Sequence, residues 1–107
     1  MLFLSIEAKA GQLTTPSFTI DITENCEEGV VGCGDVTYQG VNRKTGRSIK
    51  LKGAARMVMC ADRKTPCHFE SYQFKNGDVT YGVYPNGILT ITKGNRVALK
   101  EAGQWTY

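Results

Sequence analysis

The sequence is poor in the residues on which most catalytic and metal centres depend. Histidine occurs once, as His68, in a chain of 107 residues. A pairing of His68 with its neighbour Cys67 as base and nucleophile is not expected, because adjacent residues of a strand point to opposite faces. The sequence also lacks a phosphate-binding loop, a nucleophile elbow and a metal-ligand cluster. We therefore predict a protein without catalytic activity, metal or cofactor.

Long apolar runs and helical periodicity are missing as well. No stretch approaches the ~20 apolar residues of a membrane-spanning helix, and no apolar repeat with the period of a helix is sustained. The net charge of +3 is small, whereas nucleic-acid binding calls for a concentrated basic stripe. The densest basic stretch, residues 43–52, is interpreted as a solvated hairpin. We predict neither a membrane span nor a nucleic-acid partner.

Alternation of apolar and polar residues is the pattern that does recur, and it is typical of half-buried strands. Valine, isoleucine, threonine and tyrosine dominate the alternating runs, as expected for strands. Gly53 interrupts one run, and Ala55, Met57 and Met59 mark one face of a further strand after it. The expected strands are residues 18–23, 36–41, 49–52, 55–59, 69–74, 79–83, 89–92 and 97–100.

Glycine-containing turns follow one another closely in the carboxy-terminal third. Asn76-Gly77 is typical of a two-residue hairpin turn, because both central residues need positive φ. Residues 85–87 and Gly94-Asn95 supply two further turns. These turns indicate an antiparallel meander, so we predict an all-β barrel or sandwich of about seven to eight strands in a single domain, residues 1–107. Its buried face is expected to carry Val79, Tyr81, Val83, Leu89, Ile91, Val97 and Leu99.

The amino terminus, residues 1–10, has two interpretations. Its apolar start followed by Ala8-Lys9-Ala10 resembles the end of a secretory signal with its cleavage site, although a positively charged leader is missing. The alternation of Leu2, Leu4, Ile6 and Ala8 with mostly polar residues instead predicts a first strand. Both interpretations stay open at this point.

Four cysteines form two pairs, Cys26 with Cys33 and Cys60 with Cys67, with the same spacing in each. An even number of cysteines in a small domain predicts disulfides in an oxidising compartment. A zinc site is the second possibility, but structural zinc sites space paired ligands by about two to four residues, whereas six residues separate the cysteines of each pair here. Free buried thiols are the third possibility. Of the possible connectivities we favour Cys26–Cys33 and Cys60–Cys67, each closing a loop of about eight residues. The prediction that follows is a secreted or periplasmic protein.

The two cysteine loops are the candidate partner-binding segments, because loops on a rigid β scaffold present side chains at little ordering cost. A purely structural role as staples is the alternative. Exposed tyrosine near a turn is a typical recognition anchor, and Tyr84 is expected on the face opposite Tyr81. The candidate residues are Glu27, Glu28, Asp62, Arg63, Lys64 and Tyr84.

The carboxy-terminal segment, residues 72–83 and 89–100, resembles the closing meander of small bacterial periplasmic inhibitors of c-type lysozymes. The resemblance implies a compact antiparallel barrel carrying a disulfide. The inhibitory loop of that family has a serine-glycine motif ending in tyrosine, and this motif is not found here, so no inhibitory residue is carried over. Immunity proteins, which protect the periplasm from injected toxins, are likewise small and often disulfide-bonded.

Together these features predict a protein-binding domain whose partner is another protein, such as a peptidoglycan hydrolase or a toxin. In this hypothesis the domain occludes the partner's active cleft as an inhibitor or immunity protein. The alternative is a structural or assembly role in the cell envelope, for which a long unpaired edge strand with apolar outward residues would be the mark. The sequence predicts no oligomeric state.

Overall fold

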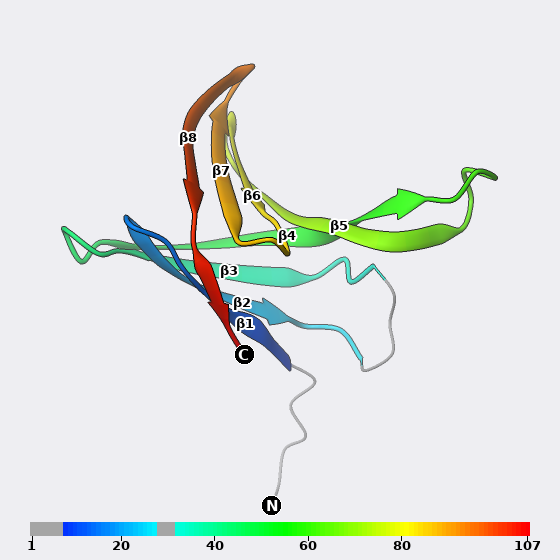
Figure 1. Ribbon diagram of the computed structural model, residues 1–107, viewed down its shortest axis with the longest axis horizontal. Helices are drawn as coiled ribbons and strands as arrows, with labels where there is room; N and C mark the ends of the chain where they lie inside the picture. Colours follow the sequence, from blue (N-terminus) through cyan, green and yellow to red (C-terminus); the bar gives the residue numbers. More distant parts are fainter. Residues whose placement is uncertain (1–7, 28–31) are drawn as a thin grey trace, which may run out of the picture.

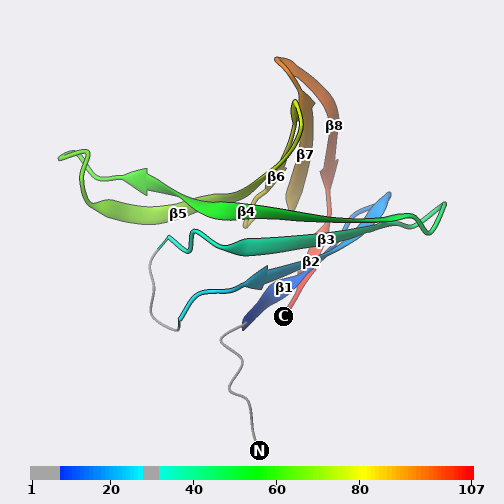
Figure 2. The same ribbon diagram turned by 180° about the vertical axis from the view of Figure 1, so that it is seen from behind.

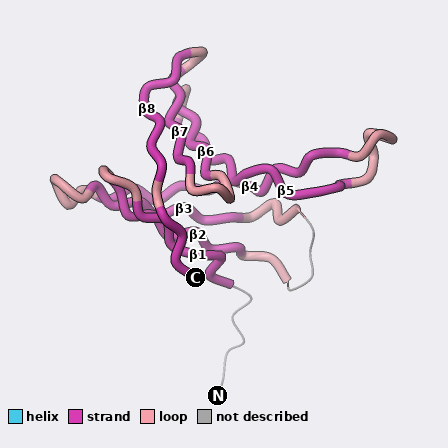
Figure 3. Tube along the Cα trace, in the orientation of Figure 1, coloured by secondary structure: helices cyan, strands magenta, loops and turns pink. Residues whose placement is uncertain are grey.

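The computed structural model describes residues 8–27 and 32–107, and these residues form strands joined by short loops, without a helix (Figure 3). The all-β prediction is therefore confirmed. The strands are β1 (Ala8–Thr14), β2 (Phe18–Glu24), β3 (Val36–Asn42), β4 (Ser48–Met59), β5 (Pro66–Asn76), β6 (Val79–Val83), β7 (Ile88–Lys93), β8 (Arg96–Ala102) and β9 (Gln104–Thr106).

The strand count of seven to eight is wrong, since the described residues form nine strands. Gly53 does not divide a strand: β4 runs through it without a break. A Cβ at this position would collide with the carbonyl oxygen of Gln73 on β5, so glycine lets the two strands approach closely. The additional strands are β1 and β9, which pair with each other from opposite ends of the chain.

The nine strands form one antiparallel sheet that curls into a nearly closed barrel. Their order is β8-β7-β6-β5-β4-β3-β2-β1-β9, so the two outermost strands are consecutive in sequence (Figure 1). Only Gly103 separates them, and its amide donates a hydrogen bond to the carbonyl oxygen of Gly87. A Cβ at Gly103 would collide with the carbonyl oxygen of Thr14. At Gly103 the chain therefore changes its pairing partner, from β7 along β8 to β1 along β9, and only glycine fits at this position.

The core lies on the concave face of this sheet. Alternate residues of neighbouring strands meet there, as in the row Ile22, Tyr38 and Leu51. The rings of Tyr38 and Phe74 lie 5.2 Å apart in a tilted arrangement, which is favourable for aromatic pairs. The buried apolar residues are Leu13, Ile20, Ile22, Cys33, Val36, Tyr38, Leu51, Tyr72, Phe74, Val83 and Leu89.

The expected buried face of the carboxy-terminal meander is confirmed for Tyr81, Val83, Leu89, Ile91 and Leu99, whereas Val79 is half-buried and is not among the core residues. Tyr81 lies opposite Ile91, which lies opposite Leu99, and all three pack against the core. Val97 was expected on the same face but is 64% exposed. A β-bulge between Ile91 and Thr92 shifts the register before Val97 is reached. The expectation for Val97 is therefore wrong.

The structure describes only the last three residues of the segment 1–10, for which two interpretations were left open. Strand β1 begins at Ala8 and pairs with β2, so the end of the segment 1–10 is a strand. Residues 1–7, including the alternation of Leu2, Leu4 and Ile6, lie outside the described residues.

Candidate protein-binding surface

A two-stranded ribbon, made of residues 54–59 of β4 and 66–71 of β5, extends beyond the barrel. Strand β6 pairs with β5 only from Tyr72 to Asn76, so within the described chain residues 66–71 pair with β4 alone. Figures 1 and 2 show this ribbon reaching away from the other strands, with the loop of residues 60–65 at its far end. We call the whole segment, residues 54–71, the β4–β5 ribbon.

The end of the ribbon is closed by covalent and hydrogen bonds. A disulfide joins Cys60 to Cys67, as predicted. Within the loop that this disulfide closes, one carboxylate oxygen of Asp62 accepts hydrogen bonds from the amides of Lys64 at 2.9 Å and Thr65 at 3.0 Å. The hydrogen bond from Lys64, together with those from Thr65, lowers the pKa of Asp62 to about 2. The carboxylate is thus a structural part of the turn at neutral pH.

Arg63 stands at the apex of this turn with a backbone φ of 59°, the one positive value at a non-glycine residue among the described residues. Arginine rarely adopts this left-handed conformation, which costs on the order of 1 kcal/mol or more. The amide of Arg63 donates to the carbonyl oxygen of Cys60 at 2.9 Å, which helps to hold it there. Arg63 and its neighbour Lys64 are both exposed, so two cations project from the end of the ribbon.

One face of the ribbon is apolar. Its cross-strand pairs are Met57 with Phe69 and Met59 with Pro66. Ala55, Met57 and Met59 are alternate residues of β4, and two register shifts interrupt the pairing with β5 along this stretch. Met59 is 49% exposed, one of the largest exposures of a big apolar side chain in the described part of the molecule. The ribbon therefore presents an apolar rim next to its cationic apex.

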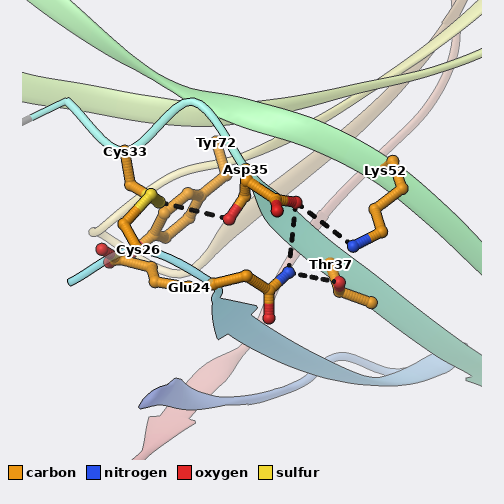
Figure 4. The surroundings of a disulfide bond; sticks show 8 residues. Glu24, Cys26, Cys33, Asp35, Thr37, Lys52 and Tyr72 are labelled. Atoms are coloured by element: carbon orange, nitrogen blue, oxygen red, sulfur yellow. Dashed lines mark hydrogen bonds and ion pairs between the residues drawn. A yellow bond between two sulfur atoms is a disulfide. The ribbon is translucent and has the colours of Figure 1, made fainter. Parts of the chain in front are cut away.

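The second cysteine loop lies beside the base of the ribbon. A disulfide joins Cys26 to Cys33, again as predicted (Figure 4). The carbonyl oxygen of Cys33 accepts a hydrogen bond of 2.8 Å from the amide of Ala55. A Cβ at Gly32 would lie 3.2 Å from the Cγ atom of Met57. The described part of this loop therefore contacts the base of the ribbon at Ala55 and Met57.

A partly buried hydrogen bond joins β5 to the end of β2, just before this loop. The hydroxyl of Tyr72 on β5 donates to Glu24 Oε2 at 2.5 Å (Figure 4). Burial first, and the neighbouring carboxylate second, raise the pKa of Tyr72 above its usual value. Glu27, the next acidic residue along the chain, is exposed. Glu28 lies outside the described residues.

Tyr84 does not belong to the same surface. It follows β6 on the face opposite Tyr81, as predicted, and a Cβ added to Gly82 would lie 3.1 Å from its ring. Its carbonyl oxygen accepts a hydrogen bond of 3.1 Å from the indole of Trp105. Figures 1 and 2 place the β6–β7 turn near the middle of the molecule, away from the end of the ribbon. The structure therefore places Asp62, Arg63 and Lys64 together at the end of the ribbon and Glu27 on the other cysteine loop, whereas Tyr84 stands apart from both.

Sequence reasoning missed Arg56 and the exposure of Met59. Arg56 is exposed and lies beside Met57, and Met59 forms the apolar rim. Alternation placed Met59 on a strand face, but it carried no sign that the strand would continue beyond the barrel. His68 is exposed and pairs with Val58 across the ribbon, and its neighbour Cys67 is bound in a disulfide, so the two form no catalytic pair.

The cysteine chemistry decides between the sequence-level alternatives. All four cysteines are in disulfides, so the zinc and free-thiol alternatives are wrong. Two disulfides are consistent with an oxidising extracellular compartment. In the described part of the chain, no helix has the length and apolar character needed to cross a membrane.

Comparison of the chain with protein-family models, with curated proteins and with solved structures finds no match in any of the three.

Proposed function

We propose that this protein is a secreted or periplasmic binding domain that occludes the active cleft of another protein with its β4–β5 ribbon. The partner is a peptidoglycan hydrolase or a related toxin, and the domain acts as its inhibitor or immunity protein rather than as an enzyme. The observation that carries this proposal is the stapled ribbon, which extends beyond the barrel and ends in two exposed cations.

The cost of building the ribbon supports a role in recognition. A two-stranded ribbon is at best marginally stable by itself in water, and this one is reinforced by the Cys60–Cys67 disulfide and by the turn around Asp62. Arg63 is held in a conformation that glycine would adopt more easily. Such strain is typical of functional sites. A stiff ribbon also loses little conformational entropy when it binds.

The charges fit the proposed partner. Glycoside hydrolases generally act through two carboxylates that flank the scissile bond. The cations of Arg63 and Lys64 are suited to pair with such carboxylates. Lysozymes are basic proteins, and the exposed Glu27 on the other cysteine loop has the opposite sign. Complementary charges of this kind increase the association rate and fix the orientation of the complex.

An assembly role in the cell envelope is the second candidate, and the exposure of Val97 favours it. Strand β8 is hydrogen-bonded to β7 and forms an edge of the sheet, with Val97 64% exposed. However, Arg96 and Lys100 lie on the same strand, and a β-bulge distorts it. Charges and bulges on an edge strand discourage the addition of further strands. The ribbon is therefore the better supported surface.

The first test is inhibition of a panel of c-type, g-type and bacterial lysozymes and other peptidoglycan hydrolases by the oxidised wild-type protein. We expect at least one enzyme to be inhibited, with saturation at one inhibitor per enzyme. Protein that is reduced and alkylated serves as the control and should inhibit less, because the ribbon is no longer stapled. Absence of inhibition across the whole panel would remove the hydrolase as the partner.

A further inference from the structure

A polar hollow lies on the convex face of the sheet, apart from the β4–β5 ribbon. Residues Ile22, Tyr38 and Leu51 point into the core, so their neighbours along β2, β3 and β4 face outward. The hollow has a volume of about 160 Å³ and is lined by Thr23, Asn25, Thr37, Gln39 and Lys50. Three adjacent strands, and the residue that follows β2, thus contribute hydroxyl, amide and ammonium groups to one place.

Part of this lining is fixed in advance. The side-chain nitrogen of Asn25 donates to Thr37 Oγ1 at 2.9 Å and to Asp35 Oδ1 at 3.2 Å (Figure 4). The amide group is thereby oriented, with its oxygen as the remaining acceptor. Because Thr37 Oγ1 accepts this bond, its own hydrogen is left to donate to a ligand.

The two lysines near the hollow differ in their partners. Lys52 forms an ion pair of 3.2 Å with Asp35, and the hydrogen bonds from Asn25 and Lys52 lower the pKa of that carboxyl. Lys50 lines the hollow and has no ion pair with the described residues. The hollow is therefore cationic at Lys50, while the charge of Lys52 is already balanced.

These groups define the chemistry of a ligand. The side chains that line the hollow are polar, whereas sites for drug-sized ligands and organic cofactors are predominantly apolar and about 300–1,000 Å³ in volume. The volume of about 160 Å³ is roughly half the lower end of that range, so the hollow suits a small polar ligand such as a single sugar residue. Hydroxyl and amide groups suit sugar hydroxyls, and the unpaired ammonium suits a carboxylate.

We propose that this hollow binds an acidic sugar residue, with its carboxylate on Lys50 and its hydroxyl groups on Thr37, Gln39 and the oxygen of Asn25. The site does not depend on the function proposed for the ribbon. Its ligand is either a free sugar acid or one residue of an acidic glycan, and the two sources share the same recognition chemistry.

Titration of the ¹⁵N-labelled protein with D-glucuronate, followed by amide chemical shifts, tests the proposal. We expect saturable shifts at residues 23–25, 37–39 and 50, with glucose and acetate each binding about tenfold more weakly because each offers only half of the recognised groups. A uronate-containing oligosaccharide that binds more tightly than glucuronate would identify a glycan as the source, and equal binding would identify the free acid.

Two lysine variants form a matched pair for this experiment. Lys50→Gln should weaken glucuronate binding about tenfold, the loss expected for one charge-assisted hydrogen bond. Lys52→Gln, on the same strand and face, should leave binding within about twofold, since the Lys52 charge is already paired. Absence of saturable shifts, equal binding of acetate and glucuronate, or equal binding by Lys50→Gln and the wild type would each overturn the proposal.

Discussion

Ser17 and Glu101 are 84 residues apart in sequence and are joined by two hydrogen bonds. The hydroxyl of Ser17 donates to Glu101 Oε2 at 2.5 Å, and its amide donates to Oε1 at 3.1 Å. Ser17 lies in the turn between β1 and β2, and Glu101 lies near the end of β8. This contact therefore ties the two ends of the sheet together at the place where the barrel closes.

Loss of this contact should change how stability depends on pH. Burial alone would raise the pKa of Glu101, but the hydrogen bonds from Ser17 and Thr15 together bring it below its usual value. A carboxyl with a lowered folded-state pKa stabilises the protein above its unfolded pKa, and this stability is lost as the pH falls through the folded value. We expect the unfolding free energy of the wild type to fall more steeply from about pH 5 to pH 3 than that of Glu101→Gln. Urea titrations across this range measure it, and identical slopes would contradict the role given to Glu101.

The different burial of Leu89 on β7 and Val97 on β8 predicts different costs for replacing each residue with alanine. Leu89 is fully buried, so Leu89→Ala should cost about 2–5 kcal/mol of unfolding free energy. Val97 is 64% exposed, so Val97→Ala should change it by less than about 0.5 kcal/mol. Chemical denaturation of both variants measures the difference. A cost above about 1.5 kcal/mol for Val97→Ala would mean that this residue is buried and that the register is wrong.

The positive φ of Arg63 predicts that replacing this residue with glycine has opposite effects on stability and on binding. Arg63→Gly should raise the unfolding free energy or leave it unchanged, because glycine adopts this conformation without strain. The same change removes the apical cation and should weaken inhibition of the partner. Lys64→Gly is the matched variant and has no strain to relieve, so it should not stabilise the protein. A clear loss of stability in Arg63→Gly would show that the side chain, not the backbone, determines the energy of the turn.

The two disulfides should respond differently to a thiol reductant. Cys67 is exposed at the end of the ribbon, whereas Cys33 is only 1% exposed and belongs to the core. We therefore expect Cys60–Cys67 to be reduced first, because thiol–disulfide exchange requires access to the sulfur. Timed alkylation and peptide mass spectrometry identify the order. Prior reduction of Cys26–Cys33 would contradict the burial described for it.

The Cys60→Ser/Cys67→Ser variant extends this test to the ribbon itself. The chain-entropy model assigns about 2.5 kcal/mol to closing a loop of this size. Since residues 66–71 pair with β4 alone, the loss should appear as faster amide hydrogen exchange in the ribbon, with β6 and β7 still protected. Uniformly faster exchange across the barrel would mean that the ribbon and barrel unfold as one unit.

Features that depend on neighbouring residues could be predicted from the sequence. Both disulfide pairings are local, because short loops select them. The turn expected at Asn76-Gly77 was placed one residue too early: Asn76 pairs with Val79, so Gly77 and Asp78 form the two-residue turn, and of these only Gly77 has a positive φ. The expected division of β4 at Gly53 was wrong because the glycine accommodates the carbonyl oxygen of a different strand. Closure through β1 and β9 was missed for the same reason, since the two strands come from opposite ends of the chain.

The candidate site shows the same limit. The charges of residues 60–67 marked the loop as a candidate, and its disulfide was expected. That β4 and β5 continue past their neighbours depends on β6 ending at Val83, which no pattern within β4 or β5 encodes. The contact between the 26–33 loop and Ala55 also joins distant segments. Sequence reasoning therefore identified the loops but not the contact of the 26–33 loop with the base of the ribbon.

The proposed mode of binding is tested most directly by removing one arginine at either end of β4 and comparing the two variants. Arg63 lies in the turn at one end, and Arg47 lies in the β3–β4 turn at the other end. Both arginines are exposed, and each turn is closed by a side-chain oxygen, that of Asp62 or of Asn42, which accepts hydrogen bonds from two backbone amides. The measurement is the inhibition constant of each variant, with the wild type as reference, against the hydrolase that the panel identifies. We predict at least about tenfold weaker inhibition for Arg63→Ala and a change within about twofold for Arg47→Ala, because only the first cation meets the cleft. Equal inhibition by Arg63→Ala and the wild type, or a larger loss in Arg47→Ala, would contradict binding through the ribbon.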